Sequence, residues 1–175
     1  MALGKRVFSG ERRLILFEDS AIEGTTLAQW QEYLSAGCDE SLLDFVEGVT
    51  PTEFRIRPLT PRQKDYIPTF ALSDRASWVW RVRLGLVAIS GYEVQDEHGN
   101  AHDLPPLKTE KLGRICADAV TEKWFADADL PGEHIMSIAM GVNAISEATA
   151  PLSQRSDSPS GAKKGARKVK AKSGA

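Results

Sequence analysis

Apolar and polar residues alternate in two segments of the first third of the chain, and each alternation predicts a short strand. Residues 12–17, RRLILF, form an aliphatic run that suits one buried strand. In residues 53–57, EFRIR, the apolar Phe54 and Ile56 alternate with three charged residues, so a strand would point the apolar pair inward. Pro58 ends this strand because proline lacks the amide that a ladder needs. We expect one small sheet, with the second strand at its edge and its arginines in solvent.

Two short helical segments are predicted between these strands. Either Thr25 or Thr26 provides the side-chain oxygen that caps the first helix, and Gly37 ends it. Asp39 then caps one further helical turn. The apolar residues of the first helix recur at spacings of three and four, which places them on one buried face. They are Leu27, Trp30 and Leu34.

Residues 51–67, PTEFRIRPLTPRQKDYI, join a strand to a helix. The TPRQ motif at residues 60–63 matches a capping box, in which the threonine oxygen accepts an amide and Gln63 reaches back to the cap residue. In residues 75–89, RASWVWRVRLGLVAI, helical and strand periods compete. A length of about fifteen residues exceeds that of a usual strand, so we predict one helix here.

The last third of the chain predicts a β-hairpin followed by two helices. Residues 92–104 resemble a hairpin or a polar excursion that turns at residues 98–100. Thr109 caps a helix that runs to Trp124, and a second helix starts near Pro131. The loop between them is short enough for an antiparallel helical hairpin. The apolar stripes are Leu112, Ile115, Cys116, Ala119 and Val120 in the first helix, and Ile135, Ile138, Ala139, Val142 and Ile145 in the second.

These elements predict an α+β fold that is mainly helical, with a small β-sheet and a C-terminal antiparallel helical hairpin. We expect one globular domain over residues 1–149, made of an N-terminal strand and helix lobe (1–50) and a helical body (51–149). Beyond it the composition turns to Ser, Pro, Gly, Ala and Lys, with almost nothing to bury. Residues 150–175 are therefore predicted to form a disordered basic tail.

Charge divides the chain in the same place. Residues 1–150 carry 15 Lys and Arg against 23 Asp and Glu, a net charge of −8, whereas residues 151–175 carry seven against one, or +6. The tail has no aromatic residues among its cations, so any contact with nucleic acid would be independent of sequence and weakened by salt. An acidic protein surface, or a solubilising role without a partner, would fit equally well. The cations with predicted tail contacts are Lys163, Lys164, Arg167, Lys168, Lys170 and Lys172.

Hydropathy and cysteine content limit the location of the protein. The longest apolar run, residues 84–89, is far shorter than the ~20 residues that span a bilayer. The N-terminal residues lack the apolar region of a secretory signal. Cys38 and Cys116 are too few for a disulfide framework, and Cys116 is predicted to be a small core residue. We expect a cytoplasmic protein without a membrane partner.

Candidate catalytic chemistry is sparse. His98 and His102 would suit a metal ion if the segment were helical, but the Gly-Asn pair between them favours a solvated hairpin tip. His134 is isolated in an amphipathic helix, which is typical of boundary packing. Asp127 and Asp129 fit helix caps better than a divalent cation site. With no glycine-rich phosphate motif, we predict a protein that is not an enzyme and has no cofactor or metal. A metal-dependent enzyme using the first two histidines is the alternative.

Tryptophan and arginine gather in one helical segment. Trp78 and Trp80 lie about 200° apart on a helix, so one of them faces outward unless the helix is buried on all sides. Arg81 and Arg83 follow directly. Tryptophan and arginine are enriched at protein interfaces, and we predict these four residues as a partner-binding surface.

The order of segments resembles the small tail-assembly proteins of tailed bacteriophages. The resemblance runs from PTEFRIRPLTPRQKDYI through WRVRLGLVAISGYEV and DEHGNAHDLPPL to two amphipathic helices, and covers residues Thr50 to Ile145. It implies a cytoplasmic, mainly helical protein that accompanies the tape-measure protein while the tail is built.

The function that this resemblance implies is a non-enzymatic tail assembly chaperone in the host cell cytoplasm. It would bind the tape-measure or tail tube protein through the Trp78 and Trp80 helix or the terminal helical hairpin, and release it when tube subunits compete. The alternative is a structural virion subunit, a head-tail or tail component whose basic tail contacts neighbouring subunits or DNA. Phage tail or virion proteins, and a second copy of the chain, are the expected partners.

Overall fold

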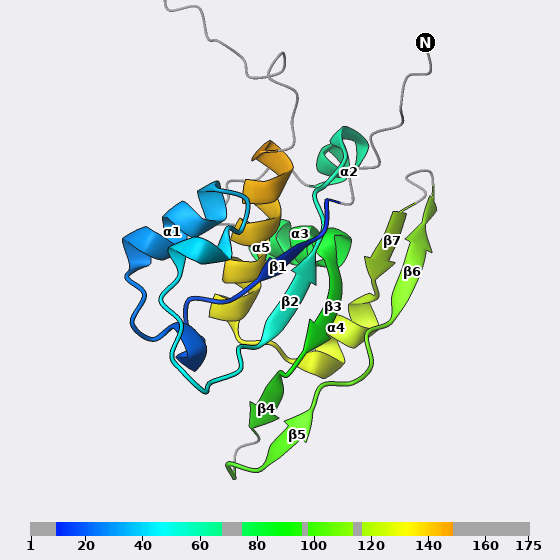
Figure 1. Cartoon of the computed structure of the whole chain (residues 1–175). Helices are drawn as coiled ribbons and strands as arrows, with labels where there is room; N and C mark the ends of the chain where they lie inside the picture. The colour runs from blue at the N-terminus through cyan, green and yellow to red at the C-terminus, as the bar shows by residue number, and fades with distance from the viewer. Residues whose placement is uncertain (1–9, 68–74, 96–97, 114–116, 149–175) are drawn as a thin grey trace, which may run out of the picture.

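A small antiparallel sheet lies beside one long helix in the computed structural model, which describes residues 10–67, 75–95, 98–113 and 117–148 (Figure 1). The chain forms an α+β fold with helices and small antiparallel sheets. In chain order the elements are β1 (Arg12–Leu14), the 3-10 turn η1 (Ser20–Ile22), α1 (Leu27–Ser35), the 3-10 turn η2 (Glu40–Leu42), β2 (Glu53–Ile56), α2 (Pro61–Tyr66), α3 (Arg75–Gly85), β3 (Leu86–Ser90), β4 (Glu93–Gln95), β5 (Ala101–Asp103), β6 (Thr109–Leu112), β7 (Ala117–Val120), α4 (Glu122–Ala128) and α5 (Gly132–Ala148).

The three-stranded sheet has the order β1-β2-β3, so β2 is its central strand. The prediction of an edge position for β2 was therefore wrong, because residues after α3 supply a third strand that pairs Phe54 with Ile89. The inward direction of Phe54 and Ile56 is confirmed, since both are fully buried. The opposite face carries charges: Arg13 and Arg55 are cross-strand partners. Like charges in this position repel, and ion pairs with carboxylates offset the repulsion.

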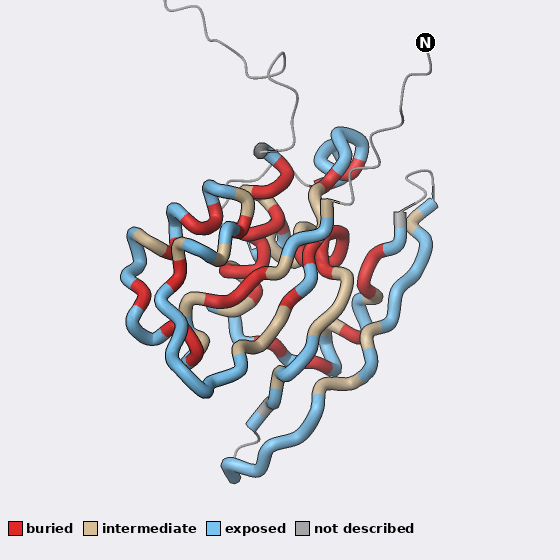
Figure 2. The backbone as a smooth tube through the Cα atoms, in the orientation of Figure 1, coloured by how far each residue is buried: buried red, intermediate tan, exposed pale blue. Residues whose placement is uncertain are grey.

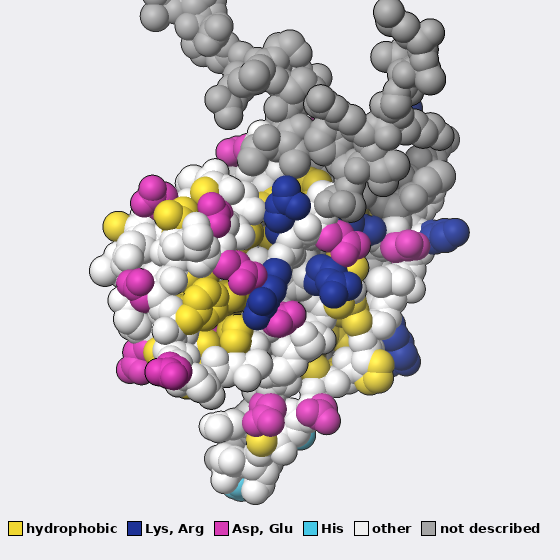
Figure 3. All heavy atoms as spheres, in the orientation of Figure 1, with side chains coloured by type: hydrophobic (Ala, Val, Ile, Leu, Met, Phe, Trp, Pro, Cys, Tyr) yellow, Lys and Arg dark blue, Asp and Glu magenta, His cyan; other side chains and the backbone are white. Residues whose placement is uncertain are grey.

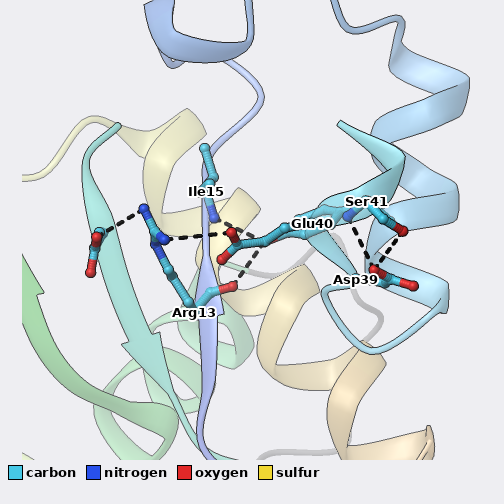
Figure 4. A network of polar contacts seen from close by, with 7 residues as sticks. Arg13, Ile15, Asp39, Glu40 and Ser41 are labelled. Atoms are coloured by element: carbon cyan, nitrogen blue, oxygen red, sulfur yellow. Dashed lines mark hydrogen bonds and ion pairs between the residues drawn. The ribbon is translucent and has the colours of Figure 1, made fainter. Parts of the chain in front are cut away.

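One of these ion pairs connects β1 to the 3-10 turn η2, and the others lie within the sheet or beside it. Arg13 contacts Glu53 at 2.8 Å and Glu40 of η2 at 3.4 Å, and Figure 4 shows it reaching from β1 toward Glu40. Arg55 contacts Glu11 at 3.9 Å. The same face, seen in Figure 3, shows Lys and Arg side chains among Asp and Glu side chains. Because these groups are partly in water, they contribute little to stability but fix the outer face as polar.

Side-chain hydrogen bonds attach α1 to β1 and to the residue that follows β1. The Tyr33 hydroxyl donates to the Arg13 carbonyl and accepts from the amide of Ile15. The indole of Trp30 donates to the Ile15 carbonyl at 3.0 Å. The predicted capping of α1 by Thr26 is confirmed, with a complete capping box. Leu27 was predicted on the buried face, but it is 52 % exposed, because the first turn of α1 extends beyond the core.

The joint formed by residues 51–67 has the predicted strand-to-helix form. Thr60 and Gln63 form the complete capping box of α2. Arg57 was expected in solvent, but its guanidinium donates to the carbonyls of Leu84 and Asp118. Residues 51–67 therefore link β2 to α3 and β7.

The segment from Arg75 onward is a helix for its first part only. It was predicted as one helix, but α3 ends at Gly85 and β3 begins at Leu86. The change happens where the chain can pair with β2. At this point the backbone amide of Arg57 donates to the Gly85 carbonyl at 2.8 Å. Pairing with β2 in the tertiary structure therefore decides the conformation of residues 86–90, although the length of the segment favoured a helix.

The predicted hairpin is confirmed, whereas the predicted helix from Thr109 to Trp124 was wrong. Strands β4 and β5 pair antiparallel. Strands β6 and β7 also form an antiparallel hairpin, which occupies most of the segment predicted as helical. The helix starts only after Thr121, whose hydroxyl caps α4. The apolar stripe fitted a helix by spacing, but residues 117–120 pair as a strand instead; Ile115 and Cys116 lie outside the described residues.

Helix α5 is the centre of the core. The predicted stripe is confirmed, since Ile135, Ile138, Ala139, Val142 and Ile145 are all buried. Its main packing partners are α3, α1 and the sheet, and the helix before it is the short α4, so the predicted helical hairpin is not clearly shown. Figure 2 shows buried residues along α5 and from the end of β1 onward, and exposed residues along the β4-β5 hairpin. Within the described residues no helix is both long and apolar enough to cross a membrane.

Candidate protein-binding groove

A groove of about 610 Å³ lies between α1, α3 and α5. This volume falls within the range of about 300 to 1,000 Å³ that is usual for binding sites. The apolar residues that line it are Leu34, Trp78, Met136, Ala139, Met140 and Ala144. The polar residues that line it are Gln31, Ser35, Arg81, Asn143 and Glu147. The groove therefore combines an apolar lining with a few polar side chains.

The groove exists because α5 has two apolar faces. One face is the buried stripe that packs on the sheet and on α3. The second face carries Met136, Met140 and Ala144, which recur every four residues and so lie in one row along the helix. Met140 is 38 % exposed, a large value for an apolar side chain in the middle of a helix. This second face lines the groove, and the described residues leave it open.

Trp78 and Trp80 lie on different sides of α3. Trp78 is half-buried and lines the groove. Trp80 packs edge-on against Tyr66, with 5.0 Å between ring centroids, and its other neighbour is the Arg83 guanidinium, 4.4 Å from the ring. Trp80 thus belongs to a second hollow of about 530 Å³ between α3 and α4. Of the two predicted anchors, only Trp78 faces the groove.

Arg81 brings a positive charge into the groove. Its guanidinium donates to the hydroxyl and to the carbonyl of Ser77, one turn earlier in α3. It forms no ion pair with a carboxylate among the residues that the structure describes. Burial lowers the pKa of Arg81, and the carboxylate of Glu147 opposes that shift.

Arg83 is inside the protein, so it cannot form part of the predicted contact surface directly. Its side chain is 3 % exposed. The guanidinium donates to the Val120 carbonyl at 2.8 Å and pairs with Glu110 at 2.8 Å and Glu122 at 3.1 Å. It therefore connects α3 to the β6-β7 hairpin and the start of α4. Arg83 was expected to be exposed, but strands β6 and β7 cover this side of α3.

The histidines do not line the groove. His98 and His102 are exposed on the β4-β5 hairpin, in agreement with the predicted hairpin tip. The His134 Nδ1 atom lies 2.8 Å from the Tyr92 hydroxyl, and burial raises the pKa of Tyr92. In the described part of the chain, no group of three or more His, Cys, Asp or Glu side chains is placed to hold a metal ion.

The two aspartates considered as a cation site have structural surroundings. Asp127 accepts an ion pair from Lys123 at 2.8 Å, one turn earlier in α4. Asp129 ends α4 with left-handed backbone angles. The six tail cations, from Lys163 to Lys172, lie outside the described residues, so their contacts stay predictions.

Sequence reasoning missed the methionines of the groove. Met136 and Met140 were not among the predicted binding residues, although their spacing of four with Ala144 marks a second apolar face. That spacing was overlooked because the stronger stripe on the same helix accounts for the core.

Comparisons with protein-family models, with curated proteins and with solved structures find no match to this chain.

Proposed function

We propose that the protein works by binding a helical segment of another protein in the groove between α1, α3 and α5, without catalysis. The observation that supports this most directly is the open apolar row of Met136 and Met140 beside Trp78. Methionine side chains adapt to different apolar surfaces, and tryptophan is a frequent anchor of binding energy. Grooves with this lining suit amphipathic helices, which insert one apolar face.

In the setting of the phage resemblance, this activity is that of a tail assembly chaperone. Its client would be the tape-measure or tail tube protein, and the groove would cover an apolar segment of that client until tube subunits compete for it. The resemblance supports the choice of a phage tail protein as the client, and the groove supports the way in which that client is bound.

The test is co-purification from infected cells with tagged wild-type protein and a Met140→Glu variant. A bound helix would desolvate the new carboxylate in the apolar row. We therefore expect the amount of tail protein recovered with Met140→Glu to be at least about tenfold lower than with wild type. The matched control is Leu27→Glu, since Leu27 is 52 % exposed on α1 and does not line the groove. Equal recovery with both variants would show that the client binds elsewhere.

The alternative is a structural virion subunit, which the strongly basic residues 151–175 favour. Such a subunit would stay in the particle, with its cations on neighbouring subunits or packaged DNA. Mass spectrometry of purified particles separates the two functions. A stoichiometric amount in mature particles would exclude a transient chaperone, whereas its absence from particles would exclude the virion subunit.

A further inference from the structure

We infer that the groove takes an acidic amphipathic helix, in which a carboxylate beside the apolar face pairs with Arg81. This inference rests on the proposed function and adds the chemistry of the partner to it. Two features of the groove support it: the contacts of Arg81, and the state of the other polar groups of the lining.

The contacts of Arg81 with the described residues leave most of its N–H donors without an acceptor. A guanidinium has five N–H donors, and the contacts described above go from one terminal nitrogen to Ser77. The side chain is half-buried, so water screens its charge less than at an open surface. A carboxylate can accept two parallel hydrogen bonds from a guanidinium. An incoming Asp or Glu would therefore find donors and charge already in place.

The other polar groups of the lining are uncharged or exposed. Gln31, Ser35 and Asn143 carry no charge. Glu147 is exposed, and its carboxylate accepts from the Asn143 side-chain amide at 3.1 Å. Glu147 acts on Arg81 electrostatically but forms no ion pair with it, and a bound helix that covers the lining would desolvate Arg81 more than the exposed Glu147. Desolvating an unpaired charge is unfavourable, so a partner with a carboxylate at this point is preferred over a neutral or basic one.

The experiment measures the binding of three fluorescein-labelled designed helices of about 18 residues, long enough for five turns. Each has Leu on one face and differs only in one residue beside that face, which is Glu, Gln or Lys. The protein is the full chain as wild type, Arg81→Gln, Arg81→Glu and Met140→Glu, and binding is followed by fluorescence anisotropy. Circular dichroism confirms that each variant is folded.

We expect wild-type protein to bind the Glu peptide at least about tenfold more tightly than the Lys peptide, a difference that one charge-assisted pair can supply. Arg81→Gln should remove most of this preference, and Arg81→Glu should reverse it. A reversal is a gain of binding by the Lys peptide, which an unfolded variant would not show. The preference of wild-type protein should also fall as salt is raised.

Two results would overturn the inference in distinguishable ways. If all three peptides bind wild-type protein equally and Met140→Glu weakens all of them, the groove binds helices but Arg81 does not select a carboxylate. In that case the proposed function stands and this inference fails. If none of the peptides binds, or Met140→Glu leaves all binding unchanged, both the groove function and the inference fail.

Discussion

At the scale of single residues, Arg83 shows how one buried cation can organise several elements. Its three polar partners belong to β6, β7 and α4, and its plane lies over the Trp80 ring. The charge is tolerated in the interior because two carboxylates and one carbonyl receive the N–H donors. Both carboxylates extend to solvent, so their own desolvation is limited.

Replacing Arg83 with methionine tests this role. Met fills much of the same space but leaves the Val120 carbonyl without its donor, and we expect the free energy of unfolding to fall by about 2 kcal/mol. Urea denaturation followed by circular dichroism measures it. The control is Arg55→Met, whose exposed side chain pairs with Glu11 at 3.9 Å, and which should cost less than about 0.5 kcal/mol. Equal losses for the two variants would contradict the buried role.

A second residue-scale feature is the buried pair Tyr33 and Cys38. Burial raises the pKa of the Cys38 thiol from 9.0 to about 11, and burial also raises the pKa of Tyr33. Both groups ionise more readily in the unfolded chain. The contribution of Cys38 to stability is complete below pH 9.0 and is lost as pH rises through about 11, whereas the contribution of Tyr33 starts to fall only above pH 10.0.

We therefore expect the free energy of unfolding to decrease between pH 9.0 and about 11. Urea titrations at a series of pH values measure this decrease. In Cys38→Ala the thiol contribution is absent, so the slope should be smaller while the remaining slope reports Tyr33. A slope that is identical in both proteins would show that Cys38 does not ionise in this range.

At the scale of elements, the close approach of α5 to its neighbours depends on two glycines. A methyl group at Gly85, the last residue of α3, would lie 2.5 Å from Val142 Cγ2. A methyl group at Gly141 would lie 2.9 Å from the δ carbons of Leu14 on β1. These two positions let α5 lie against α3 and the sheet with little space between the backbones, and they fix where the second face of α5 opens.

Gly85→Ala should thus destabilise the protein by about 2 kcal/mol through overpacking. Thermal or urea unfolding gives the value, and a second change, Val142→Ala, should recover part of the loss by making room for the methyl group. Gly132→Ala is the matched control, because no atom lies within 4 Å of the added methyl, and it should be neutral or stabilising. A neutral Gly85→Ala would mean that the contact is looser than described.

Which elements were predictable follows from how local their signals are. The capping boxes at Thr26 and Thr60, and the core stripe of α5, depend on residues within one or two helical turns. The strand identity of residues 86–90 depends on a distant partner, β2, and that of residues 117–120 depends on pairing with the neighbouring β6, although the apolar spacing of this segment fits a helix. For the groove, Trp78 and Arg81 were found from residue type, but the methionines required knowledge of which face of α5 the core leaves open.

At the scale of the whole molecule, the four tryptophans occupy different surroundings. Trp30 and Trp124 are each 2 % exposed, and their indoles donate to the carbonyls of Ile15 and Pro105. Trp80 is enclosed by an aromatic ring and a guanidinium. Trp78 is half-buried in the groove lining, so its indole is the one that a groove ligand would cover.

Trp78 is therefore a built-in optical reporter of groove occupancy. When a tryptophan-free helix fills the groove, the indole loses contact with water, and the emission maximum of the protein should move to shorter wavelength. Subtracting the spectrum of Trp78→Phe isolates the signal, while Trp80→Phe should leave the shift in place. A client that binds without any change in this emission would have to sit on another face of the protein.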